Sequence, residues 1–185
     1  MTEFAIDTVL APGAWTLDPA ASTATFVAHQ LGRAIPGSIP IRGASAVIGP
    51  DRDIRGAHVE LDIAAISTGI EKRDLDLAKP RLLNTARFPT LSVEVAPAQW
   101  TGKGWDATGT IRVRGIEFPV GLAITVQAVE ISGAVRVFIT GAFNRKPIGI
   151  KAPNFVIGKN VEVAVRASFT RDADFPARHN DASSP

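Results

Sequence analysis

Apolar and polar residues alternate along most of this chain, which is the pattern of strands that bury one face and expose the other. The clearest run covers residues 57–63, where Ala, Val, Leu and Ile alternate with His, Glu and Asp. Similar alternation predicts the other strands, around residues 23–30, 44–48, 91–95, 107–114, 120–126, 135–139 and 161–170. About eight strands with one polar face favour an antiparallel barrel or sandwich.

One segment near the middle of the chain breaks this alternation. Thr68 and Glu71 have the spacing of a capping box, so Thr68 is expected to cap a helix. Residues 73–78 are compatible with helix, and Pro80 suits the first turn of a second short helix. We therefore expect a single helical insertion, from Glu71 to Asn84, in an otherwise all-β chain.

The interior of an eight-stranded barrel is either filled by side chains or wide enough for one small ligand. Several positions on the predicted apolar faces hold small residues, namely Ala24, Ala28, Ala57, Ala107, Gly109 and Ala167. These residues leave space at the middle of the barrel unless larger residues opposite them fill it. The sequence leaves both alternatives open. Trp15, Trp100 and Trp105 are expected to plug or rim the barrel.

The composition mainly excludes classes of protein and kinds of site. With 45% hydrophobic and 21% charged residues, the chain is of the ordinary globular class rather than disordered. It has no cysteine, which excludes a disulfide framework, a thiolate metal site and a cysteine nucleophile. Its three histidines are far apart in sequence, so no metal site is expected. The net charge is only +2, and no basic stripe with interleaved aromatics indicates nucleic-acid binding.

The length of 185 residues suits one domain with a sizeable core. We expect an N-terminal extension over residues 1–14, the barrel over 15–171, and a disordered polar tail over 172–185. The first segment has acidic residues, no Lys or Arg and no long apolar stretch, so it lacks the parts of a secretory signal. No stretch reaches the roughly 18 apolar residues that a membrane span requires. We therefore expect a cytoplasmic protein that does not span a membrane.

Several short motifs follow one another in a fixed order. They are Trp15-Thr16-Leu17-Asp18-Pro19, Ser67-Thr68-Gly69, Arg73-Asp74, Leu83-Asn84, Arg87-Phe88-Pro89, Thr108-Gly109-Thr110-Ile111 with Gly115 and Pro119-Val120, and Phe143-Asn144-Arg145. From Trp15 to Thr170 the chain resembles the YceI-like family of polyisoprenoid-binding, lipocalin-like barrel proteins. The resemblance implies an all-β fold, an antiparallel lipocalin-like barrel of about eight strands with one short helical insertion. It also implies binding of a polyisoprenoid or similar long-chain amphiphile, without catalysis, for carriage, storage or protection.

The chain departs from this family at three positions. Many members have a histidine where this chain has Ala21, Gln30 and Asp76. The loop over residues 37–43 also looks shortened. These departures concern the polar chemistry available to a ligand rather than the fold.

Polar candidates for catalysis have simpler interpretations. Glu60 and Asp62 share one strand face and could act as paired carboxylates, but they lie opposite the apolar face, so we expect solvated charges. His58 lies on the same outer face. Arg73 and Asp74 are expected to hold the start of the helix. Ser22 lacks a visible base or nucleophile motif.

An apolar interior is thus the feature that could carry specific function. The inward positions expected to contact a ligand are Phe26, Ala28, Gln30, Leu61, Ile63, Leu91, Val93, Ile111, Val113, Leu122, Val137 and Val163. A buried Gln30 would bond to the polar end of a ligand or satisfy backbone groups at the rim. No catalytic residue, metal or cofactor is expected, although an isoprenoid quinone could be the cargo. The expected partner is a hydrophobic small molecule, and a homodimer is left open. Two alternatives stay open: an enzyme acting on a hydrophobic substrate in the same barrel, and a filled-barrel scaffold that works through a protein partner.

Overall fold

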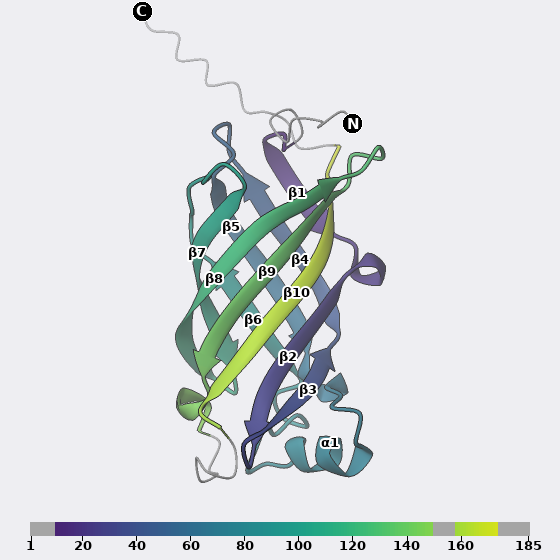
Figure 1. The fold of residues 1–185 in the computed structure, drawn as a ribbon, viewed down its shortest axis with the longest axis vertical. Coiled ribbons are helices and arrows are strands. Elements are labelled where there is room, and N and C mark those ends of the chain that lie inside the picture. The colour runs from purple at the N-terminus through teal and green to yellow at the C-terminus, as the bar shows by residue number, and fades with distance from the viewer. Residues whose placement is uncertain (1–9, 150–157, 174–185) are drawn as a thin grey trace, which may run out of the picture.

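The computed structural model describes residues 10–149 and 158–173. Ten strands form one antiparallel sheet in the order β1-β4-β5-β6-β7-β8-β9-β10-β2-β3 (Figure 1). The strands are β1 (Gly13–Leu17), β2 (Thr23–Gln30), β3 (Arg33–Ile39), β4 (Ile41–Ile48), β5 (Ile54–Asp62), β6 (Thr90–Val95), β7 (Gly104–Val113), β8 (Ile116–Val129), β9 (Val135–Asn144) and β10 (Asn160–Arg171). One α-helix, α1 (Glu71–Leu77), and the short 3₁₀ helices η2 (Pro19–Ala21), η3 (Ile63–Ala65) and η4 (Lys146–Ile148) complete the described elements.

The sheet closes because β1 pairs on both of its edges. One edge is bonded to β4, and the other lies against the end of β10, where Trp15 is opposite Arg171 and Leu17 is opposite Phe169. Eight strands, β1 and β4 to β10, therefore form a closed ring. This ring confirms the predicted antiparallel barrel, and closure removes the exposed edges that an open sheet would present.

The two additional strands, β2 and β3, form a hairpin that extends the barrel. β2 continues beyond β1 along the same side of β10, with Phe26 opposite Val163. The chain turns at Leu31-Gly32, both in the left-handed region, and returns as β3. The hairpin corrects the expectation of a shortened loop over residues 37–43, because these residues lie mostly in β3 and β4. Pro36 is tolerated in β3 because this strand ends the sheet order and so needs no second partner.

A seam separates β3 from the rest of the barrel. β3 pairs with β2 along one edge, and its other edge has one isolated bridge in the described residues, from Ser38 to Ser67. The segment over residues 63–89, which includes η3 and α1, fills the space beside this edge at the lower end of the barrel (Figure 1). Backbone ladders therefore close the upper part of the barrel, whereas this segment helps to close the lower part.

The helical insertion is present but shorter than predicted. α1 ends at Leu77, and residues 80–84 form turns instead of a second helix. Ile70 is the N-cap and makes no side-chain cap bond, so the predicted capping box with Thr68 is wrong. The physical reason is that the Thr68 hydroxyl donates to Asp74, which lies three residues beyond the expected partner Glu71.

Two buried clusters mark the ends of the barrel interior. β7 shows the alternation most clearly, since its odd-numbered residues from Trp105 to Val113 are buried and its even-numbered residues are exposed. The upper cluster includes Trp15 and Trp105, whose indole N–H groups donate to the carbonyls of Ala11 and Arg52. The Trp100 ring packs edge-on against Trp105, with ring centroids 4.9 Å apart. The expected plugging role of these tryptophans agrees with this arrangement.

The expected barrel domain spans residues 15–171. In the structure β1 begins at Gly13 and β10 ends at Arg171. Residues 1–9 of the predicted extension and 174–185 of the predicted tail lie outside the described residues.

Candidate functional site

A cavity of about 300 Å³ lies inside the barrel. Residues from all ten strands line it, and the wall is almost entirely apolar. Thr25, Ser45 and Arg145 are the polar residues of this wall in the described part of the chain. Apolar cavities of about 150 Å³ already stay dry and take up small apolar molecules, so a cavity of this size and lining favours an apolar ligand.

The structure brings together eleven of the twelve side chains predicted to face a ligand. On the wall are Phe26, Ala28, Leu61, Ile63, Leu91, Val93, Ile111, Val113, Leu122, Val137 and Val163. Period-two alternation located them because successive side chains of a strand point to opposite faces. That a ligand contacts these residues remains a prediction.

Gln30 is the exception. It is exposed at the last position of β2, beside the Leu31-Gly32 turn, so the expectation that it is buried is wrong. It has the same parity as Phe26 and Ala28, but β2 runs beyond the end of its pairing with β10. A side chain on the inward-facing side of a strand is buried only where the other strands enclose the interior.

The small residues play two different parts. Ala24, Ala28, Ala57 and Ala167 lie on the cavity wall, where short side chains leave room. At Gly109 the space is occupied, because a Cβ there would lie 3.0 Å from Val93 Cγ1 and 3.1 Å from Leu122 Cδ1. Both alternatives that the sequence left open therefore hold, at different positions.

The lower wall contains residues that the sequence analysis missed. They come from the helical insertion and from β9 and η4, and include Ile66, Leu77, Leu82, Leu83, Phe143 and Ile148. Strand alternation gives no information about them, because most lie outside the alternating runs. The available signal was the presence of apolar residues in an insertion that is otherwise strongly charged.

A hydrogen-bonded network holds the insertion in place. Asp74 Oδ1 accepts from the Thr68 amide at 2.9 Å and from the Thr68 hydroxyl at 2.5 Å. Arg73 Nε donates to the same hydroxyl at 2.7 Å, and another guanidinium nitrogen donates to the Thr68 carbonyl at 2.9 Å. The Thr68 hydroxyl lowers the pKa of the Asp74 carboxyl, and its backbone N–H and the nearby Arg73 charge add to the effect. Arg73 and Asp74 thus take the structural role predicted for them.

Arg145 is the charged residue on this wall within residues 10–149 and 158–173. It is only 3% exposed, and its Nε donates to the Gly158 carbonyl at 2.7 Å. A buried guanidinium stays protonated and is a donor only, so it can bind carbonyl or anionic oxygen atoms but cannot accept a proton. The Phe143-Asn144-Arg145 motif alone gives no indication that Arg145 lies on the cavity wall.

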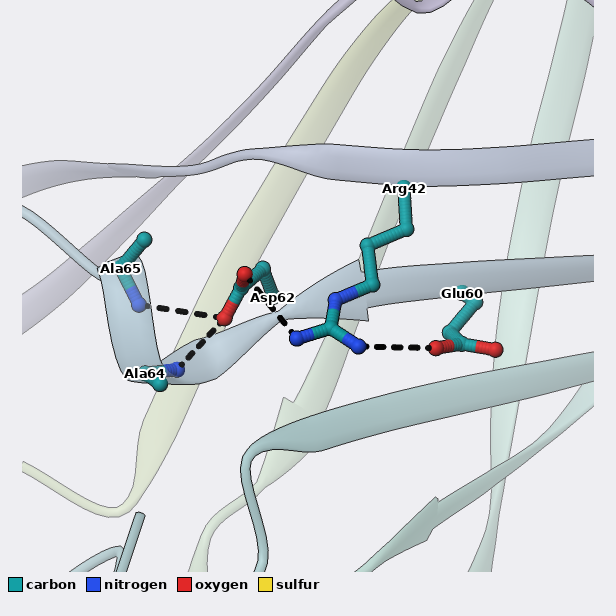
Figure 2. Close-up of polar contacts among 5 residues, drawn as sticks. All are labelled: Arg42, Glu60, Asp62, Ala64 and Ala65. Atoms are coloured by element: carbon teal, nitrogen blue, oxygen red, sulfur yellow. Dashed lines mark hydrogen bonds and ion pairs between the residues drawn. The ribbon is translucent and has the colours of Figure 1, made fainter. Parts of the chain in front are cut away.

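The outward carboxylates have structural partners (Figure 2). Arg42 contacts Glu60 at 3.5 Å and Asp62 at 3.1 Å. Asp62 also accepts from the amides of Ala64 and Ala65, at 3.1 and 3.3 Å, and so caps η3. These contacts agree with solvated charges on the outer face. His58, on the same face, contacts Glu94 at 2.5 Å.

The described residues contain no cluster of three or more His, Cys, Asp or Glu side chains that could hold a metal ion. Within those same ranges, none of the helices has the length and apolar character needed to span a bilayer.

A family model described as the YceI-like domain matches residues 15–169. The chain belongs to the YceI-like family. A search among curated proteins found no match.

Three solved structures show the same fold at low sequence identity. BcnA of Burkholderia cenocepacia is 15% identical with a TM-score of 0.74, and the match covers 83% of this chain and 99% of that one. A polyisoprenoid-binding domain from Saccharophagus degradans is 18% identical with a TM-score of 0.64, over 85% and 98%. The YceI protein of Campylobacter jejuni is 15% identical with a TM-score of 0.63, over 75% and 86%. At these identities the likeness establishes the lipocalin-like barrel fold.

Proposed function

We propose that this YceI-like protein binds a polyisoprenoid or a similar long-chain amphiphile in the barrel lumen and does not catalyse a reaction on it. The observation that carries the proposal is the cavity of about 300 Å³ with its apolar wall. This volume is at the small end of the roughly 300–1,000 Å³ range of ligand pockets. Each methylene buried there contributes roughly 0.8 kcal/mol, so a long chain is held without any specific polar contact.

Family membership supports the same class of ligand. The Saccharophagus degradans structure of the same fold is described as a polyisoprenoid-binding domain. An isoprenoid quinone is one cargo of this chemical class. The function would be carriage, storage or protection of the chain, and we include a cytoplasmic location in the proposal, to be tested by fractionation of the native host.

An enzyme acting on a hydrophobic substrate is the second candidate, and the residues on the wall favour it less. In the described residues, the wall has no carboxylate or imidazole. The guanidinium of Arg145 is a hydrogen-bond donor only, so it does not supply a general base. Substrate turnover would therefore need an acid or base from elsewhere.

Native mass spectrometry of the full chain, followed by lipid extraction, tests the proposal. The purified protein is also incubated with a radiolabelled polyprenol, to test uptake when no lipid co-purifies. We expect an added mass that organic extraction releases as an unchanged chain. A chemically altered chain would indicate an enzyme, and no bound chain and no uptake would indicate a filled scaffold. The same spectra report whether the protein is a dimer.

A further inference from the structure

Exposed apolar side chains gather at one end of the barrel. Among the described residues, the exposed large hydrophobics are Leu31, Val47, Ile70, Leu75 and Ile131. Leu31 is 67% exposed in the β2–β3 turn, Ile70 is 53% exposed directly before α1, and Leu75 is 63% exposed on α1. The β2–β3 turn and α1 both lie at the lower end of the barrel, away from the N- and C-terminal ends of the described chain (Figure 1).

The same end carries an excess of positive charge. Residues 70–89 contain five Lys or Arg and three Asp or Glu. The Asp76–Lys79 pair cancels one charge of each sign and Asp74 bonds to the neutral Thr68, so the excess stays at two positive charges, five minus three. Two further basic residues are exposed. Arg33 directly follows the β2–β3 turn, and Lys146 lies on η4.

α1 connects this surface with the lumen. Leu75 points outward and is exposed, whereas Leu77, two residues later, lies on the cavity wall. One short helix therefore contributes to both the outer apolar surface and the inner wall. The distance from the outside of the molecule to the lumen is thus about one helix diameter, roughly 10 Å.

We propose that the lower end of the barrel, defined by Leu31, Ile70 and Leu75 with the surrounding basic residues, docks on an anionic lipid surface. Apolar side chains enter the boundary between headgroups and acyl chains, and Lys and Arg are attracted to anionic headgroups. Charge complementarity favours an anionic lipid surface as the partner, because a neutral apolar partner would gain nothing from the basic residues around Leu31, Ile70 and Leu75. The proposal rests on the proposed function in one respect: an isoprenoid cargo resides in membranes, so a carrier must meet them to exchange it.

Vesicle co-sedimentation of the full chain tests the docking. Vesicles of phosphatidylcholine alone are compared with vesicles of phosphatidylcholine and phosphatidylglycerol in equal parts. We expect binding to the anionic vesicles that weakens with added salt. Each basic side chain near the surface contributes about fivefold, so the Lys72→Gln/Arg81→Gln variant should bind the anionic vesicles roughly 20-fold or more weakly. Binding that is equal for both vesicle types would overturn the proposal, as would no binding at all.

A matched pair of apolar variants tests the position of the surface. Leu31→Ser/Leu75→Ser removes two exposed side chains at the lower end, and Ile131→Ser removes one in the β8–β9 turn at the opposite end. All three positions are exposed, so the fold should tolerate the changes. We expect the double variant to lose vesicle binding and Ile131→Ser to keep it. Equal losses, or none in the double variant, would contradict the docking surface.

Lipid extraction from the same preparations separates the two proposals. If the double variant retains a bound chain but does not sediment, both proposals hold. If the wild type sediments but never holds a chain, the docking surface stands and the lumen proposal fails. If it holds a chain but never sediments, only the docking proposal fails.

Discussion

Asp74 accepts two hydrogen bonds from Thr68, one from the backbone amide and one from the hydroxyl. The two residues are six positions apart, and the segment between them contains Gly69 in the left-handed region. The contact folds this segment back on the first turns of α1. It therefore fixes the insertion that supplies Leu77 and Leu82 to the cavity wall.

Acidification should release this contact. The Asp74 pKa is lowered in the folded protein from its ordinary value of 3.8. A lowered carboxyl pKa contributes stability that is present above 3.8 and is lost as the pH falls through the folded-state pKa. Thermal unfolding of wild type and Asp74→Asn, followed on both sides of this pH, checks it. We expect the variant to be less stable near neutrality and to lose less stability on acidification; parallel curves would contradict this role.

Ala28→Trp tests whether the lumen holds a chain. The ring would occupy space on the cavity wall, and each displaced methylene forfeits roughly 0.8 kcal/mol. Losing two or three methylenes weakens binding by about tenfold or more. Ala123→Trp, on the exposed face of β8, is the matched control. We expect lipid retention to fall in Ala28→Trp alone, with little change in melting temperature; a large drop in melting temperature in a protein that never held lipid would favour a filled scaffold.

Gly109→Val should overpack the barrel. A Cβ at this position would lie 3.0–3.1 Å from atoms of Val93, Val120 and Leu122. We expect the substitution to lower the free energy of unfolding by about 1–3 kcal/mol in a urea titration. Gly121→Val is the control, since Gly121 is exposed on a strand and a Cβ added there would meet no atom within 4 Å beyond its chain neighbours. There we expect a gain of roughly 0.5 kcal/mol, because glycine weakens a strand interior.

Asp62 should contribute as a cap more than as a charge. Asp62→Ala removes the acceptor for the amides of Ala64 and Ala65, and losing a helix cap costs about 1 kcal/mol. Asp62→Asn keeps an acceptor and removes only the exposed pairing with Arg42, which is worth at most about 1 kcal/mol. Chemical denaturation of both variants measures the difference. Equal losses in the two variants would assign the effect to the charge.

The sequence alone predicts the barrel because alternation locates eight of the ten strands. It misses β1 and β3 for local reasons: β1 has only five residues, and β3 contains Pro36 and Gly37, which resemble loop residues. The same parity rule places Phe26, Leu61 and Val163 on the cavity wall but fails at Gln30, where β2 outruns the enclosing strands.

The remaining parts of the site depend on tertiary packing. Which face of α1 meets the lumen cannot be inferred from seven residues whose polar and apolar positions fit several orientations. Arg145 likewise gives no local signal of burial, because arginine is usually exposed and here is held by a carbonyl thirteen residues away.

The seam beside β3 implies that two parts of this molecule open at different rates. Amide protons in the closed ring of eight strands exchange with solvent only when many ladder bonds break together, so their exchange reports global unfolding. The segment over residues 63–89 meets β3 through a single isolated bridge in the described residues, so it can open locally while the ring stays intact. If a chain binds in the lumen as proposed, we expect its lifetime to follow this local opening rather than global stability. We expect substitutions in the segment that leave the Thr68–Asp74 contact intact to change the residence time of a bound chain more than the melting temperature.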